Sequence, residues 1–233
     1  MESLTSVYLL PGMMCDERLF APQIACLSRD YDVVVGDITG FDSIGAIADS
    51  VLSTAPEKFA LAGLSMGGIV AMQIMAQAPH RVERLALLDT NPCAELVAMK
   101  TRRVSQLKKV KAGLLPVVMR DEMKPNYLAS GHGKQAILDL CLEMAEDLGA
   151  DVFQRQSHAL RDRADQQETL RNISVPSLIL CGREDRACPV ERHTLMHRLI
   201  PDSTLVIVEG AGHLPTLEKP EATNAALLLW LGA

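Results

Sequence analysis

The sequence has little that would place the protein on nucleic acid or in a membrane. Positive charge is in deficit, because 23 lysine and arginine residues face 29 acidic ones and give a net charge of −6. Nucleic acid and anionic membranes bind proteins that offer a basic surface. The apolar run near the N-terminus is interrupted at Pro11-Gly12 and is too short to cross a bilayer. We therefore expect no nucleic acid partner and no membrane partner.

Signs of export and of bound metal are equally scarce. The N-terminal residues Met1 to Thr5 contain no lysine or arginine, which a secretory signal peptide requires. The six cysteines are scattered without a C-x-x-C pair, so they suit buried thiols in a reducing compartment better than disulfides or a zinc site. We expect a cytoplasmic protein with no disulfide, no metal and no cofactor.

What the chain does contain is enough for one folded domain. Its 233 residues are 48% hydrophobic and 22% charged, an ordinary balance for a globular protein and far from a disordered one. A chain of this length can bury a substantial core and still leave room for one sizeable insertion. Two independent domains are not expected.

Short apolar segments alternate with helical patterns in the first 90 residues and again after about residue 174. Polar and apolar residues do not alternate in these segments, which is typical of strands covered on both faces. The helical stretches between them predict crossover connections between parallel strands. The pattern predicts a doubly wound, mostly parallel α/β sheet, whose active site lies at the carboxyl ends of the strands. The six expected strands are Ser6 to Leu10, Tyr31 to Val35, Phe59 to Ala62, Arg84 to Leu88, Val175 to Cys181 and Thr204 to Val208.

Between Pro92 and Arg171 the strand pattern gives way to helical spacing. We therefore expect a core made of residues 1–91 and 172–233, with a helical insertion over 92–171. Because the insertion leaves the edge where the active site is expected, it is predicted to cover that site as a lid; the alternative is a packing layer away from it. Three stripes define its helices: Val104, Leu107, Val110 and Leu114; Ile137, Cys141, Met144 and Leu148; and the weaker Phe153, Gln156 and Leu160.

The pentapeptide Gly63-Leu64-Ser65-Met66-Gly67 joins the third expected strand to an apolar helix. A serine at such a turn is held in a strained backbone conformation, which fits only where the residues two before and two after it lack bulk. Gly63 and Gly67 meet that requirement. The hydroxyl then projects above the sheet beside the free amides of a helix start, so Ser65 is the candidate nucleophile. The alternative is a glycine-rich turn that merely closes tightly.

A nucleophilic serine needs a base within hydrogen-bond reach and a third group that orients the base. His213 follows the last expected strand, and Asp185 follows the strand before it. Both residues lie just beyond carboxyl ends that a single crossover separates, so their loops can be neighbours on one rim of the sheet. Asp89 and, more weakly, Asp37 are alternative candidates for the acid.

The order Ser65, Asp185, His213 resembles that of the α/β-hydrolase superfamily. Within that superfamily the chain resembles the small cap-bearing esterases and thioesterase-like enzymes, including the pimeloyl-carrier methyl esterases, more than the large lipases. The resemblance spans nearly the whole chain. Its four motifs are Leu10-Pro11-Gly12, the serine turn, the acid loop Gly182 to Pro189, and Gly210-Ala211-Gly212-His213 followed by Glu218-Lys219-Pro220-Glu221.

This resemblance implies a serine hydrolase that cleaves a carboxylic ester or thioester through an acyl-serine intermediate. The implied oxyanion hole consists of the backbone N–H groups of Met13 and Met66. One departure is that Pro11-Gly12 stands where family members usually have His-Gly. The same machinery also supports hydrolysis of a carbon–carbon bond or of an enol-lactone, and a low-turnover receptor that keeps the pocket is a further alternative.

Three further groups of residues carry weaker expectations. The basic run from Lys100 to Lys111 is expected to be the solvated face of a helix, and otherwise a docking patch for an acidic carrier protein. His193 and His197 have a spacing that can hold a metal, although exposed helix histidines are commoner. His132 and His158 fall in the insertion as surface or lid residues. Methionines predict an apolar, adaptable pocket for a small-molecule substrate: Met13, Met14, Met66, Met99, Met119, Met123 and Met144.

Overall fold

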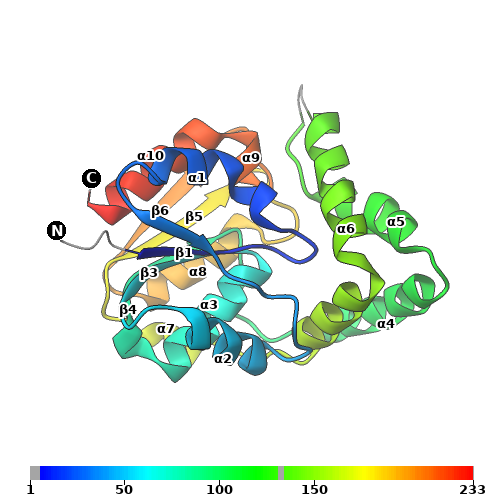
Figure 1. The fold of residues 1–233 in the computed structure, drawn as a ribbon, viewed down its shortest axis with the longest axis horizontal. Helices are drawn as coiled ribbons and strands as arrows, with labels where there is room; N and C mark the ends of the chain where they lie inside the picture. The colour runs from blue at the N-terminus through cyan, green and yellow to red at the C-terminus, as the bar shows by residue number, and fades with distance from the viewer. Residues whose placement is uncertain (1–5, 131–133, 233) are drawn as a thin grey trace.

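The computed structural model describes residues 6–130 and 134–232, which build a six-stranded sheet with helices on both faces (Figure 1). Every neighbouring pair of strands is parallel, in the order β2-β1-β3-β4-β5-β6. The predicted doubly wound α/β class is confirmed, and each expected strand is present within two residues at either end. The strands are β1 (Ser6–Leu10), β2 (Asp32–Val35), β3 (Phe59–Leu64), β4 (Val82–Leu88), β5 (Ser177–Gly182) and β6 (Ser203–Val208).

The side of the sheet on which the chain adds its next strand changes once, after β2. The chain first steps from β1 to β2 on one side, and then returns to place β3 on the other side of β1. Loops that leave the carboxyl ends of two such strands diverge to opposite faces of the sheet and open a crevice between them. The loops after β1 and β3 carry Met13 and Ser65, so the fold directs both residues to this crevice.

Two helical layers explain why the strands read as continuous apolar runs. Helices α1 (Ala21–Leu27) and α10 (Pro220–Leu231) cover one face, while α2 (Ile44–Thr54), α3 (Met66–Gln77) and α8 (Val190–Leu199) cover the other (Figure 1). Successive side chains of a strand point to opposite faces, so both sets on β3 are buried. Phe59 and Leu61 join the core under α2 and α3, and Ala60, Ala62 and Leu64 join the core under α1 and α10.

The chain between β4 and β5 forms the helical insertion, which stands beside the core in Figure 1. Its main helices are α4 (Val97–Lys111), the short α5 (Leu115–Val117) and α6 (Lys134–Arg161), which bends at Gly149 where φ is 80°. From α6, Arg155 donates to the Thr39 carbonyl beyond β2 at 2.8 Å, and Gln156 accepts from the Met14 amide beyond β1 at 2.9 Å. The insertion therefore lies against loops at the carboxyl ends of the strands. Helix α7 (Gln167–Arg171) packs instead against α3 and α8.

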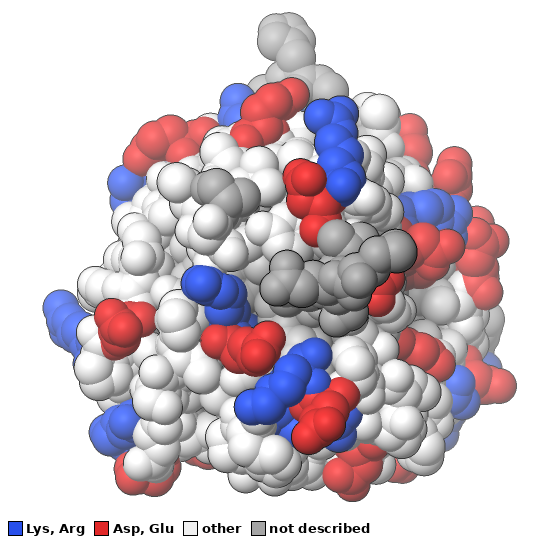
Figure 2. All heavy atoms as spheres, turned by 60° about the vertical axis from the view of Figure 1, so that its left-hand side comes forward, with Lys and Arg blue, Asp and Glu red and all other residues white. Residues whose placement is uncertain are grey.

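The described residues on the face of the molecule in Figure 2 form no large patch of a single charge. Figure 2 turns the left side of Figure 1 forward, and on this face acidic and basic side chains lie intermingled among uncharged ones. Within the described ranges no helix has both the length and the hydrophobicity to cross a bilayer. All six cysteines are free thiols. Met1 to Thr5 and His132, on which two predictions rested, lie outside the described residues.

Candidate active site

Ser65 occupies a sharp turn between β3 and α3, with φ 55° and ψ −113°. A positive φ costs a non-glycine residue roughly 1–3 kcal/mol, so the surroundings must enforce it. A Cβ atom on Gly63 would lie 2.3 Å from the Gly67 carbonyl oxygen, and one on Gly67 would lie 2.0 Å from the Leu10 oxygen. The backbone approaches so closely at this turn that both positions require glycine.

Hydrogen bonds link the side chains of Ser65, His213 and Asp185. Nε2 of His213 lies 3.0 Å from Ser65 Oγ, and Nδ1 of the same ring lies 2.8 Å from Asp185 Oδ2. His213 is only 4% and Asp185 only 5% exposed, so little water competes for these contacts. With the Nδ1 proton donated to the carboxylate, Nε2 is free to accept a proton from the serine hydroxyl. The structure thus brings together three residues that are far apart in the sequence.

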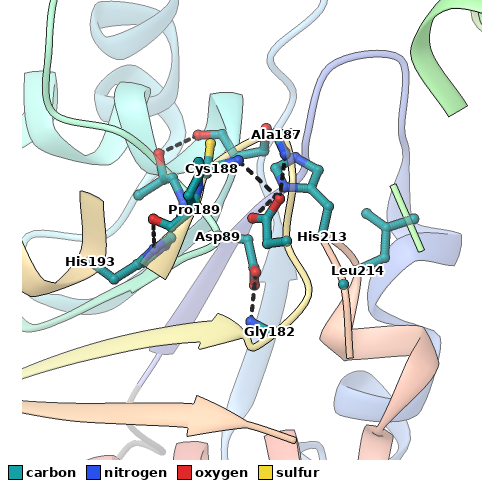
Figure 3. Close-up of polar contacts among 12 residues, drawn as sticks. Asp89, Gly182, Ala187, Cys188, Pro189, His193, His213 and Leu214 are labelled. Atoms are coloured by element: carbon teal, nitrogen blue, oxygen red, sulfur yellow. Dashed lines mark hydrogen bonds and ion pairs between the residues drawn. The ribbon is translucent and has the colours of Figure 1, made fainter. Parts of the chain in front are cut away.

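The environment of Asp185 favours its ionised form. Burial raises the pKa of this carboxyl, but the His213 side chain and the amides of Ala187 and Cys188 outweigh that effect and hold the pKa below its usual value. The two amides donate to Oδ1 at 2.8 and 2.9 Å (Figure 3). A charged carboxylate fixed in this way can orient the imidazole and stabilise it when it becomes protonated.

Asp89, the alternative acid, has a different set of contacts. Its Oδ1 accepts the Gly182 amide at 2.9 Å (Figure 3), and its Oδ2 has no hydrogen-bond partner among the described residues. Complete burial, followed by the nearby charge of Asp185, raises the pKa of Asp89 well above its usual value. Burial beside Asp185 therefore disfavours the ionised form of Asp89. The weaker candidate, Asp37, is exposed and closes its own turn by accepting from the Thr39 amide and hydroxyl.

The backbone amides of Met13 and Met66 have no acceptor within the part of the chain that the structure describes. Met66 is the first residue of α3, where amides lack a partner within the helix. The loop that carries Met13 is braced by the fully buried Gln156, whose Oε1 accepts from the Met14 amide at 2.9 Å and whose Nε2 donates to the Ile38 carbonyl at 3.4 Å. The sequence offered one signal for Gln156: a polar residue within an otherwise apolar stripe.

Glu218 braces the loop of His213, a role that sequence reasoning missed. Its Oε1 accepts from the amides on both sides of the histidine, Gly212 at 2.9 Å and Leu214 at 3.1 Å. Its Oε2 accepts from the amide of Ala129 at 2.8 Å. Burial raises the pKa of this carboxyl although the three amides oppose the shift. A single acidic side chain thus ties the histidine loop to the segment that precedes α6.

The expectation that His193 and His197 are exposed is wrong, because His193 is fully buried and His197 is half-buried, and the structure does not assemble the pair into a ligand site. Nε2 of His193 accepts from the Thr90 amide at 3.0 Å, and its Nδ1 lies 3.3 Å from the Pro189 carbonyl oxygen (Figure 3). Nδ1 of His197 lies 2.9 Å from the Ser203 hydroxyl. Both nitrogen atoms of His193 are therefore engaged. His158 is half-buried on α6.

Within the described ranges, one group of side chains has the geometry of metal ligands: Asp185, Cys188 and His213, whose ligand atoms lie within 4.8 Å of one another. Burial raises the pKa of the Cys188 thiol well above its usual value, and a protonated thiol is a poor ligand. Asp185 and His213 already bind each other. Asp185 and His213 belong to the chain of hydrogen bonds that ends at Ser65, and the group suits this role better than metal coordination.

His193 is expected to make the folded protein sensitive to acid. Burial lowers the pKa of this imidazole to about 4, from 6.5 in an open chain. The unfolded chain then binds a proton at position 193 more readily than the folded one. The stability that the folded protein gains from a neutral His193 is therefore fully present above pH 6.5 and is lost as the pH falls toward 4. We expect a loss of about 2 kcal/mol in the free energy of unfolding at pH 5. Urea denaturation at pH 7.5 and pH 5.0 measures this loss.

A glutamine at position 193 separates this effect from general acid denaturation. His193→Gln retains an acceptor for the Thr90 amide but does not titrate, so its stability should fall less between the two pH values. His80→Gln is the matched control, because His80 is exposed. The same acid-induced loss in His193→Gln as in the unmutated protein would show that His193 is not responsible.

A cavity of about 420 Å³ opens at Ser65 and His213. The expectation of an apolar pocket is only partly right. Met13, Met66, Met99 and Met123 line the cavity, whereas Met14, Met119 and Met144 are buried in the core. The charged side chains that line it are Arg102, Arg103, Arg163, Arg186, Arg192, Glu95 and Glu122.

Arg103 explains part of this difference from the expected pocket. It belongs to the basic run from Lys100 to Lys111, but its side chain turns into the cavity and is only 12% exposed. The lining of the cavity therefore combines charged side chains with methionines. Such a lining suits a small molecule that carries charge as well as apolar surface.

Comparisons with known proteins agree with this architecture. The chain matches the alpha/beta hydrolase family model over residues 7–226. RutD of Yersinia enterocolitica, named as a candidate carbamate hydrolase, is 24% identical over 97% of this chain and 87% of its own. The pimeloyl-[acyl-carrier protein] methyl ester esterase of Legionella pneumophila is 25% identical over 91% of this chain and 89% of its own.

A solved structure extends the likeness to three dimensions. The malate-bound esterase from Thermogutta terrifontis has a TM-score of 0.90 at 26% identity, and the alignment covers 99% of this chain and 90% of that one. The family match, the hydrolase relatives and the shared fold all span nearly the whole chain. The chain therefore belongs to the alpha/beta hydrolase family and is an enzyme of the hydrolase type.

Proposed function

We propose that the protein hydrolyses a carboxylic ester or thioester through an acyl-serine intermediate. One observation carries the proposal: His213 lies 3.0 Å from the Ser65 hydroxyl through Nε2 and 2.8 Å from Asp185 through Nδ1. In this arrangement the histidine takes the proton as the serine oxygen attacks the carbonyl carbon. The carboxylate holds the ring in the required tautomer and stabilises the imidazolium that forms.

The amides of Met13 and Met66 are the proposed oxyanion donors. Each such donor contributes roughly 3–4 kcal/mol of transition-state stabilisation in related chemistry. When the tetrahedral intermediate collapses, the carbonyl–oxygen or carbonyl–sulfur bond breaks and His213 returns its proton to the leaving alcohol or thiol. Water then attacks the acyl-serine with the same histidine as base, which releases the carboxylic acid and restores Ser65. Relatives named as esterases support an ester as the substrate.

Covalent labelling and turnover together test this proposal. A fluorophosphonate probe should modify Ser65 with one equivalent, read out by peptide mass spectrometry. p-Nitrophenyl esters from acetate to decanoate, and acyl thioesters beside them, should show sustained turnover. Labelling without turnover would favour the receptor-like alternative. Neither labelling nor hydrolysis of any compound would overturn the proposal.

An acidic carrier protein is the proposed partner if the acyl group arrives bound to one. The surface available to such a partner is smaller than the basic run indicates, because Arg103 turns inward and Lys109 pairs with Glu122 at 2.6 Å. Lys108 and Lys111 remain exposed on α4. Reversing the charge of these two lysines should then raise KM for a carrier-bound ester alone. An equal rise for a free ester would contradict carrier docking.

A further inference from the structure

Three charged residues beside the cavity form a buried cluster with more positive than negative charge. Glu95 Oε2 accepts from Arg103 Nε and from Arg163 Nη1, each at 2.9 Å. The side chains of Arg103, Arg163 and Glu95 are only 12%, 7% and 5% exposed. Two guanidinium groups therefore share a single carboxylate, and one positive charge is left over.

The other charges that line the cavity do not balance this surplus. The second acid, Glu122, pairs with Lys109. Arg186 and Arg192 also line the cavity, and within the described ranges neither has a carboxylate partner. Arg186 is exposed and Arg192 is half-buried, so water screens both, whereas the surplus charge of the buried cluster has no counter-ion in the described part of the chain, which is unfavourable. The cavity of a protein with a net charge of −6 is thus itself positive.

Two of these arginines direct an outer nitrogen atom at sulfur. Arg103 Nη1 lies 3.8 Å from the Met13 sulfur, and Arg192 Nη1 lies 3.3 Å from the Cys93 sulfur. Sulfur is a weak acceptor, whereas a carboxylate oxygen is a strong partner for a guanidinium. Met13 also supplies a proposed oxyanion amide. The Arg103 guanidinium therefore contacts the side chain of the residue whose backbone amide is proposed to bind the oxyanion of the reacting ester.

The arginines also converge around one residue, Cys93. Arg163 Nε donates to the Cys93 carbonyl at 2.9 Å, and Arg192 donates to the sulfur of the same residue. Arg163 joins Arg103 through Glu95, so the positive groups form a continuous wall of the cavity rather than scattered surface charges. Such a wall attracts an anion and fixes its place relative to Ser65.

We propose that the substrate carries a free carboxylate in addition to its ester, and that Arg103 binds this carboxylate while Arg163 and Arg192 add positive charge beside it. The inference rests on the proposed hydrolysis at Ser65, and it names the substrate class as half-esters of short dicarboxylic acids. The buried cluster of Arg103, Arg163 and Glu95 has one surplus positive charge, which matches a carboxylate; a phosphate monoester, which carries about −1.5 to −2 at neutral pH, is the competing anion that the test separates. Hydrolysis would add one water, release the alcohol and leave a dicarboxylate.

Matched pairs of esters test this assignment. Monomethyl succinate, glutarate and adipate differ from the corresponding dimethyl esters only in the free carboxylate. For at least one chain length, kcat/KM should be about tenfold or more higher for the monomethyl ester, since the contact is a charge-assisted hydrogen bond. Arg103→Met should reduce that ratio toward one. This variant leaves Glu95 and Arg163 as a balanced pair, so the fold should be retained.

Lys58→Met is the matched control. It also removes one positive charge from the protein, but Lys58 is exposed and does not line the cavity. The ratio of kcat/KM for the two esters should therefore stay as in the unmutated protein. A ratio that falls equally in Lys58→Met and Arg103→Met would assign the preference to overall charge and overturn the role of Arg103.

A second readout requires no ester turnover. The free dicarboxylates should slow fluorophosphonate labelling of Ser65 in the unmutated protein, and this protection should be lost in Arg103→Met. Equal kcat/KM for every ester pair, or a higher value for a methyl ester that ends in phosphate, would overturn the carboxylate assignment and leave the esterase proposal intact. Absence of both labelling and hydrolysis would count against the proposed function instead.

Discussion

Replacing Ser65 with alanine is expected to lower kcat for every hydrolysed ester by about four to six powers of ten. The variant loses the atom that would form the covalent bond, and His213 Nε2 loses the hydroxyl that lies 3.0 Å away. No other described hydroxyl bonds to that nitrogen atom. The oxyanion amides and the cavity remain, so weak binding of substrate should persist. Steady-state kinetics with the best ester of the panel measures the loss.

The fold should tolerate this change, because alanine keeps the Cβ atom and therefore the same steric demands at a φ of 55°. We expect the free energy of unfolding to change by no more than about 1 kcal/mol, the typical value of one hydrogen bond. Ser105→Ala on the exposed face of α4 is the control and should keep full activity and full labelling. Activity of Ser65→Ala near that of the unmutated protein would remove Ser65 from the mechanism.

The sheet could be predicted from the sequence because its signals are local. Strands β1, β3 and β5 are apolar runs buried on both faces, while the edge strands β2 and β6 are apolar but mostly half-buried. Turn residues next to each run mark where the strand begins and ends. The two glycines around Ser65 are a local signal as well, because the close backbone approach that requires them arises within one turn and the strand beside it. Loops after consecutive parallel strands meet at one edge, which is why His213 and Asp185 could be placed near each other.

The braces and the charge of the cavity could not be predicted, because they depend on partners far away in the chain. Gln156 binds the amide of Met14, 142 positions earlier, and helical periodicity gives no information on such a contact. Arg103 follows the spacing of a solvated basic helix. Its inward direction depends on Glu95 and on the second buried arginine that Glu95 also binds. Pairing of this kind is decided by tertiary packing rather than by local pattern.

Asparagine substitutions at Asp185 and Asp89 are expected to have very different effects, although both acids are buried at the ends of neighbouring strands. Asp185→Asn should lower kcat by about four powers of ten. Its carbonyl oxygen can still accept from Ala187 and Cys188, so its amide nitrogen faces the imidazole. That nitrogen donates to Nδ1, which places the ring proton on Nε2, where it can no longer accept from Ser65.

Asp89→Asn should keep activity within about tenfold of the unmutated value, because the His213 ring bonds to Asp185 and not to Asp89. The asparagine carbonyl can accept from the Gly182 amide as Asp89 does now, and burial already disfavours a charge at this position. Kinetics of the two variants at one pH, with thermal unfolding as a check on folding, measures the contrast. An inactive Asp89→Asn beside an active Asp185→Asn would transfer the orienting role to Asp89. Because the two sites share burial and differ in contact with His213, the contrast isolates the carboxylate of Asp185 as the group that the histidine requires.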